Sequence, residues 1–190
     1  MKRVLIFLAL LLPLLLLVYQ VLVEQVNDPI KYIYSFTGSA AIVLVFFTLA
    51  LSLIRKWVNL MKFRRMIGLY AFFYAFLHFL VFFVLDAQFD IEFVIEESID
   101  KPFVYLGMIA FFVLVYMAIT SKKQLFKKYN KYHNSIYLVA VLITIHFVMA
   151  QKSLSPEQWG YLVLILLITG AKLLQKSKLV KIYNTTRNIK

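Results

Sequence analysis

Six long apolar stretches dominate this sequence and limit what the chain can fold into. They run over roughly 4–23, 37–54, 66–85, 102–120, 135–150 and 158–174. The first five contain no charged residue, and the sixth has only Lys172, whose long side chain can reach the membrane interface. A bilayer core of about 30 Å requires about 20 mostly apolar residues in a helix. We therefore predict an all-α membrane protein with six transmembrane helices that form one domain over residues 1–190.

The first stretch follows Lys2 and Arg3, so it also resembles the start of a secretory signal peptide. Its apolar run of about 20 residues exceeds the usual 7–15, and no A-x-A cleavage pattern follows it. We therefore expect this stretch to be retained as a membrane span. Pro13 lies in its middle, where it either kinks the helix or is tolerated as an ordinary membrane proline.

The charged residues between the stretches separate by sign into two groups. The two ends of the chain and alternate connectors carry 18 basic residues and no acidic one: Lys2, Arg3, Arg55, Lys56, Lys62, Arg64, Arg65, Lys122, Lys123, Lys127, Lys128, Lys131, Lys172, Lys176, Lys178, Lys181, Arg187 and Lys190. The other connectors carry 3 basic and 9 acidic residues: Glu24, Asp28, Lys31, Asp86, Asp90, Glu92, Glu96, Glu97, Asp100, Lys101, Lys152 and Glu157. The positive-inside rule then predicts that both termini are cytoplasmic and that the acidic connectors lie outside.

This sorting also explains the net charge of +12, which in a soluble chain would suggest nucleic-acid binding. We expect no nucleic-acid partner, because the hydrophobic fraction of 63% exceeds that of soluble domains. The basic face can also bind anionic lipid headgroups or an acidic partner, although orientation alone accounts for it. The 86–101 connector carries six acidic residues, more than orientation requires. It is either a docking surface for an extracytoplasmic protein or a solvated loop.

The chain has only three histidines, and all lie in or beside the predicted spans. His78 is in the third, His146 is in the fifth, and His133 is at the cytoplasmic end of the fifth. Ionisable residues inside a membrane are functional candidates, although one histidine can simply join helices by a hydrogen bond. His78 follows Arg64 by 14 residues and His146 follows His133 by 13. At 1.5 Å per residue these are rises of about 21 and 20 Å.

The matched rises place His78 and His146 at similar depth in the outer half of the membrane, where facing helices could clamp a planar ligand. Two neutral imidazoles suit the iron of a b-type haem, which helix bundles commonly hold in their cores. The absence of Cys excludes disulfides, thiolate metal ligands and covalent CxxCH haem attachment. Zinc and a proton relay are alternatives, but zinc lacks a third ligand at that depth and a relay lacks a buried acid. The phenylalanines around His78 suit either a porphyrin pocket or a lipid-facing surface.

At the cytoplasmic end, His133 could ligate a second haem. Arg64 or Arg65 would then pair with a propionate or lie near the iron. The alternative is a solvated interfacial histidine in a basic loop.

The stretch from Arg64 to His78, RRMIGLYAFFYAFLH, resembles the third helix of the MsrQ family, formerly YedZ. These proteins are the haem-binding membrane subunits of bacterial periplasmic methionine sulfoxide reductase systems. FTG at 36–38, KPFVYLG at 101–107 and AITS at 118–121 are similar to helix ends in that family, and His133, Tyr137, His146 and Phe147 keep its spacing. The resemblance covers about residues 36–174.

The pattern around His133 departs from the family. Tyr129, Tyr132 and Asn134 stand where the family usually has Trp, Leu and Arg. The wider family resembles the ferric reductase and NADPH oxidase transmembrane domain, which typically carries two histidines on each of two helices. Arg64 stands where an inner histidine would then be expected.

The resemblance implies transmembrane electron transfer through haem b in the bacterial inner membrane. Electrons would leave to a periplasmic molybdopterin-containing reductase, which reduces methionine sulfoxide in oxidised proteins, so this chain would not perform the sulfoxide chemistry itself. About 16 residues follow Leu174, too few for a flavin or nicotinamide domain, so we expect a separate donor. That donor is either a soluble flavin reductase, with FMN at the basic inner face, or a membrane quinol. The alternatives are a small transporter or channel, and a cofactor-free assembly protein that uses its histidines structurally.

Overall fold

The computed structural model describes residues 2–24, 26–56, 60–151 and 156–188. It also describes their side chains, except those of Lys56, Glu157, Leu173 and 176–188. Lys152 and Lys190, which the charge pattern includes, lie outside the described residues. Within the described ranges the regular structure is helical throughout, without a strand, which agrees with the predicted all-α class.

Five segments of the described chain are long and apolar enough to cross a membrane. The first two are α1, Lys2–Leu22, and α2, Pro29–Ala50. The third joins a 3-10 turn, Met61–Phe63, to α3, Arg64–Leu80, and to a π-helical stretch, Val81–Asp86. The fourth is α5, Pro102–Thr120. The fifth joins α6, Lys123–Tyr129, through the 3-10 stretch Asn130–Ser135 to α7, Ile136–Ala150.

The sixth predicted span lies within α8, Pro156–Asn188, and it stays a prediction. The apolar part of α8 is Gln158–Lys172, which is shorter than the other candidate spans. The helix itself continues through the basic end of the chain, because nothing in that segment breaks it. Lys172 is buried, and its ammonium group donates to Gln175 Oε1 at 3.3 Å.

The predicted start of the second span and the predicted 86–101 connector both differ from the structure, and in each place an aspartate caps the start of a helix. α2 begins at Pro29 instead of near residue 37, because Asp28 caps it by accepting a hydrogen bond from the Lys31 amide at 3.0 Å. The 86–101 connector is not simply a loop, since it contains α4, Ile91–Asp100. The predicted 102–120 span coincides with α5.

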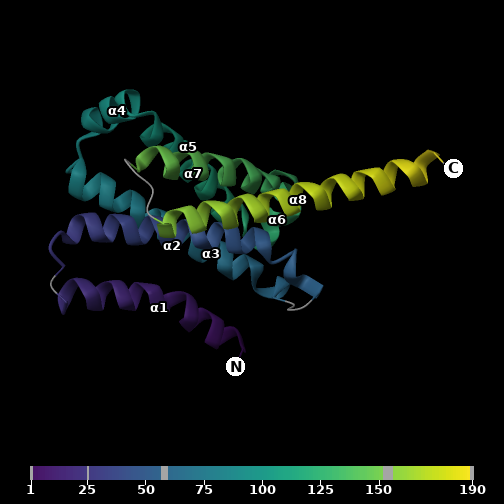
Figure 1. The fold of residues 1–190 in the computed structure, drawn as a ribbon, viewed down its shortest axis with the longest axis horizontal. Helices are drawn as coiled ribbons and strands as arrows, with labels where there is room; N and C mark the ends of the chain where they lie inside the picture. The colour runs from purple at the N-terminus through teal and green to yellow at the C-terminus, as the bar shows by residue number, and fades with distance from the viewer. Residues whose placement is uncertain (1, 25, 57–59, 152–155, 189–190) are drawn as a thin grey trace.

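The core of the fold is a four-helix bundle of α2, α3, α5 and α7 (Figure 1). α2 packs mainly on α3, and α5 packs mainly on α7. Contacts of α3 with α5 and of α2 with α7 close the arrangement. The largest buried cluster joins these helices and includes Val45, Phe46, Ala71, Leu114 and Val139. The bundle has an α4 end and an α6 end, and the N-terminus and the far end of α8 both lie towards the α6 end (Figure 1).

α1 lies outside the bundle, along α2 and α3, and its ribbon is bent (Figure 1); Pro13 lies inside this helix. The Tyr74 side chain of α3 is fully buried and explains how the bend is accommodated. Its hydroxyl donates to the Leu10 carbonyl at 2.9 Å and accepts from the Leu14 amide at 3.1 Å. A side chain inserted between the carbonyl and amide of one helical turn is a known cause of a kink. Pro13 lies within this same turn, and α3 supplies the polar group that bridges the Leu10 carbonyl and the Leu14 amide.

Candidate functional site

His78 of α3 and His146 of α7 face each other inside the bundle. Their ring centroids are 6.2 Å apart, and their planes are inclined at 85°. Both side chains are half-buried. The structure thus brings together the two histidines that the matched helical rises placed at one depth.

Each ring is fixed by a hydrogen bond from Nδ1 to a backbone carbonyl. His78 Nδ1 donates to the Tyr34 carbonyl at 3.0 Å, and His146 Nδ1 donates to the Phe103 carbonyl at 2.6 Å. Because a carbonyl can only accept, Nδ1 carries the proton of each neutral ring, and Nε2 keeps its lone pair. The same outer hydrogen bond orients most metal-ligating histidines in proteins. The buried Thr37 hydroxyl lies 3.4 Å from His78 Nδ1.

Two glycines provide the space that these rings occupy. A Cβ added at Gly107 would lie 2.8 Å from Nδ1 and Cε1 of His146, closer than real Cβ atoms approach. A Cβ added at Gly38 would lie 3.0 Å from Cε1 of His78. The motifs identified in the sequence included both glycines without giving them a role. The sequence signal that could have indicated a role is that both glycines lie within predicted apolar helices, in a chain with only five glycines.

The two imidazoles fit a haem iron better than a zinc ion. Two nitrogens that bind one metal from opposite sides at about 2 Å each leave their ring centroids about 6 Å apart. No group of three or more His, Cys, Asp or Glu side chains that could hold a metal occurs among the described residues. A structural zinc ion needs four protein ligands and a catalytic one needs three. A two-histidine site suits a metal whose other positions are filled by a macrocycle.

The phenylalanines near His78 pack between helices and do not surround the histidine pair. Phe72, Phe76 and Phe79 of α3 stack on Phe111 of α5, with centroid distances of 6.3, 6.4 and 4.5 Å. The aromatic ring that contacts His78 is instead Tyr34 of α2, at 4.4 Å. The flanking phenylalanines therefore give no evidence for a porphyrin pocket.

A cavity of about 590 Å³ opens near the α6 end, away from the histidine pair. Its lining brings together Arg64, Arg65 and His133, the three residues that the sequence placed at this depth. Other lining residues include Thr48, Gly68, Phe72, Lys123, Phe126 and Lys127. The volume lies within the range of ligand sites, about 300–1,000 Å³. With four cationic side chains and no acidic one in its lining, the cavity favours an anionic ligand.

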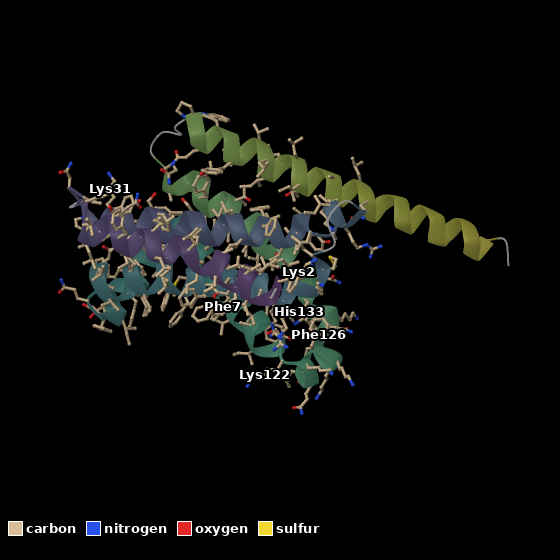
Figure 2. The ribbon with its side chains drawn as sticks, turned by 90° about the horizontal axis from the view of Figure 1, so that it is seen from below. Lys2, Phe7, Lys31, Lys122, Phe126 and His133 are labelled. Atoms are coloured by element: carbon tan, nitrogen blue, oxygen red, sulfur yellow. The ribbon has the colours of Figure 1, made fainter. Side chains whose placement is uncertain are left out.

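His133 is held differently from the other two histidines. Its Nε2 lies 3.1 Å from the hydroxyl of Thr120, which itself donates to the Tyr116 carbonyl at 2.8 Å. Nε2 is therefore the protonated donor, and Nδ1 is left with the lone pair. The ring also packs on Phe126 at 4.8 Å, and Figure 2 shows both residues at the same end as Lys2 and Lys122. Any metal site at His133 would thus differ chemically from the His78 and His146 pair.

Known proteins resemble this chain in sequence. Residues 37–146 match the family described as ferric reductase like transmembrane component. Over 175 residues, the chain is 34% identical to the protein-methionine-sulfoxide reductase heme-binding subunit MsrQ of Pectobacterium carotovorum subsp. carotovorum strain PC1. That alignment covers 87% of this chain and 88% of the relative. The chain belongs to the MsrQ family.

Other MsrQ proteins show a similar likeness. The MsrQ heme-binding subunit of Rhizobium meliloti strain 1021 is 32% identical over 156 residues, which cover 79% of this chain and 72% of that protein. The MsrQ of Salmonella paratyphi B is 33% identical over 153 residues, which cover 76% and 77% of the two chains. No solved structure matches the chain. The family match from Thr37 to His146 contains the histidine pair and all residues that line the cavity.

Proposed function

We propose that this MsrQ-family protein is a haem b membrane subunit that carries electrons across the bacterial inner membrane. The donor lies on the cytoplasmic side, and the acceptor is a periplasmic molybdopterin-containing methionine sulfoxide reductase that repairs oxidised proteins. The observation that carries the proposal is the pair His78 and His146, with both Nδ1 atoms bonded to carbonyls and their rings 6.2 Å apart. The names of the relatives, heme-binding subunits, support it.

The residues of the pair have separate tasks in this proposal. Nε2 of His78 and Nε2 of His146 would hold the iron, and the carbonyls of Tyr34 and Phe103 fix the tautomer and direction of each ring. A bound haem supplies a carrier of one electron at a time, with a potential that its ligands and surroundings adjust. The protein contributes position and a water-poor interior, while the sulfoxide chemistry takes place on the partner.

The direction of transfer rests on the charge pattern. The predicted six-span topology would put the α6 end in the cytoplasm. The group of 18 basic residues without an acidic one would then lie inside, as the positive-inside rule requires. Figure 2 is consistent with this, since Lys2 and Lys122 lie at one end and Lys31 at the other. The cationic cavity would then open towards the donor side. Its cationic lining suits the propionates of a second haem or the phosphate of FMN.

The visible absorption spectrum of the detergent-purified protein tests the main proposal. We expect a Soret band, α and β bands on reduction with dithionite, and one or two non-covalent haems per chain by pyridine haemochrome assay. A haem-free protein from haem-sufficient cells would contradict the proposal. Substrate flux through such haem-free protein in liposomes would favour a transporter or channel instead.

The His133→Ala variant tests the second haem. If Nδ1 of His133 ligates a haem in the cavity, we expect the haem-to-protein ratio to fall by about half, as for loss of one of two sites. Lys128→Ala is a suitable control, because Lys128 lies on the same basic surface but does not line the cavity. An unchanged ratio would identify His133 as an interfacial histidine.

A further inference from the structure

The short helix α4 lies at the membrane surface because of its place in the chain. The segment before it ends at Asp86 and the helix after it begins at Pro102, and both are candidate membrane spans. Gln88 and Phe89 have positive φ angles of 47° and 66°, so the backbone turns sharply into α4. Asp90 then caps the helix by accepting from the amides of residues 92 and 93 at 2.9 and 3.2 Å. Figure 1 shows α4 beside the end of the bundle at which α5 begins.

The side chains of α4 form three rows along the helix. The half-buried row, on the side that packs on α5, consists of Phe93, Val94, Glu97 and Ser98. An exposed apolar row consists of Ile91, Ile95 and Ile99, with 66%, 55% and 74% of their surfaces exposed. An exposed acidic row consists of Glu92, Glu96 and Asp100. At 3.6 residues per turn, the apolar row lies between the packed row and the acidic row.

We propose that the isoleucine row of α4 is inserted into the lipid of the adjoining leaflet, while the acidic row faces water. Soluble surfaces rarely keep such an apolar strip uncovered, whereas helices with one apolar and one charged face lie in the membrane interface. The strip also continues the apolar surface of the bundle. Phe89, 63% exposed, precedes Ile91 and contacts Phe83 of the spanning segment with ring centroids 5.4 Å apart.

Charge attraction does not hold α4 on the membrane. Interfacial helices that bind from solution usually carry Lys and Arg opposite their apolar face, which attract anionic lipids. The exposed charges of α4 are all acidic, and Lys101 beside it is paired with Glu97 at 2.6 Å. Because α4 is joined to spanning segments at both ends, it is kept at the surface without electrostatic binding. Its contact with lipid is therefore apolar and independent of anionic headgroups.

Site-directed spin labelling tests this placement, and the absence of native cysteine makes single labels simple to introduce. The informative variants are Ile95→Cys and its neighbour Glu96→Cys, with Ile99→Cys and Asp100→Cys as a second pair. The labelled protein is reconstituted into bilayers of phosphatidylcholine alone and with added phosphatidylglycerol. Collisions of each nitroxide are then measured with oxygen, which concentrates in lipid, and with a water-soluble nickel chelate. Monodisperse elution confirms that each variant is folded.

We expect the ratio of oxygen to nickel accessibility to be several-fold higher at positions 95 and 99 than at positions 96 and 100, in both lipid mixtures. High nickel accessibility at all four positions would overturn the proposal, since the isoleucines would then face water. Low accessibility to both reagents at 95 and 99 would also overturn it, because a protein surface would cover the row. The inference requires only that the chain spans a membrane. Haem content is not a readout, so its failure is distinguishable from that of the proposed function.

Discussion

His146→Ala is expected to remove most of the haem that we propose to lie between α3 and α7. Loss of even an outer hydrogen bond to a metal-ligating histidine lowers metal affinity about 10- to 100-fold, and loss of the ligand itself should cost at least as much. His78→Ala should have the same effect, because each ring would supply one of the two protein ligands. The measurement is the haem-to-protein ratio of the purified variants, together with the position of the Soret band.

A matched control is Ile145→Ala on the same helix. Ile145 is 41% exposed and directly precedes His146. Its replacement by alanine shortens a side chain at the same depth without removing a ligand. Its haem content should equal that of the unaltered protein. If His78→Ala and His146→Ala both kept an unchanged Soret band at full intensity, the histidine pair would not be the haem site.

Gly107→Ala is expected to reduce haem binding nearly as strongly, although it removes no ligand. The added methyl group would lie 2.8 Å from the ring of His146, so the ring has to move and the 2.6 Å bond from Nδ1 to the Phe103 carbonyl is lost. Overpacking of this kind typically costs about 1–3 kcal/mol, here at the expense of ligand orientation. Gly38→Ala should have a smaller effect, since its Cβ would lie 3.0 Å from the ring of His78. Haem content and thermal stability are measured for each variant.

Gly160→Ala and Gly170→Ala add the same methyl group as Gly107→Ala, but we expect them to leave haem binding unchanged. Nothing lies within 4 Å of a Cβ added at either position. Alanine is favoured over glycine inside a helix by about 1 kcal/mol, so these variants should retain haem and be equally or slightly more stable. Full haem content in a folded Gly107→Ala variant would show that the His146 ring does not bind the iron in the orientation seen here.

An α-helix rises by about 1.5 Å per residue, and this is why relative depths along the two helices could be predicted. The depths of His78 and His146, and of Arg64 and His133, follow from counting residues along two helices. The rotation of each helix about its axis does not follow from the count, so the facing of the two rings had to come from the structure. The carbonyls of Tyr34 and Phe103 could not be predicted, because every residue carries a carbonyl and none is marked as an acceptor by its side chain.

Hydropathy located α5 with the correct ends because no charge or cap interrupts residues 102–120. It failed at the start of α2 because the Asp28 cap and Pro29 extend that helix beyond its apolar part. Hydropathy also did not reveal α4, because its isoleucines and acidic residues lie too close together in the sequence to form an apolar stretch. The role of Gly38 and Gly107 could not be predicted from their place in apolar helices, since the need for space becomes visible only beside the histidine rings.

The Tyr74 hydroxyl has a consequence for how the protein is assembled. α1 is synthesised before α3, yet the turn between Leu10 and Leu14 is completed by a side chain 60 residues later in the chain. Until α3 enters the bilayer, the Leu10 carbonyl and the Leu14 amide must find other partners within α1 or in water at the interface. α1 therefore reaches its final shape only after the histidine-bearing helix is in place.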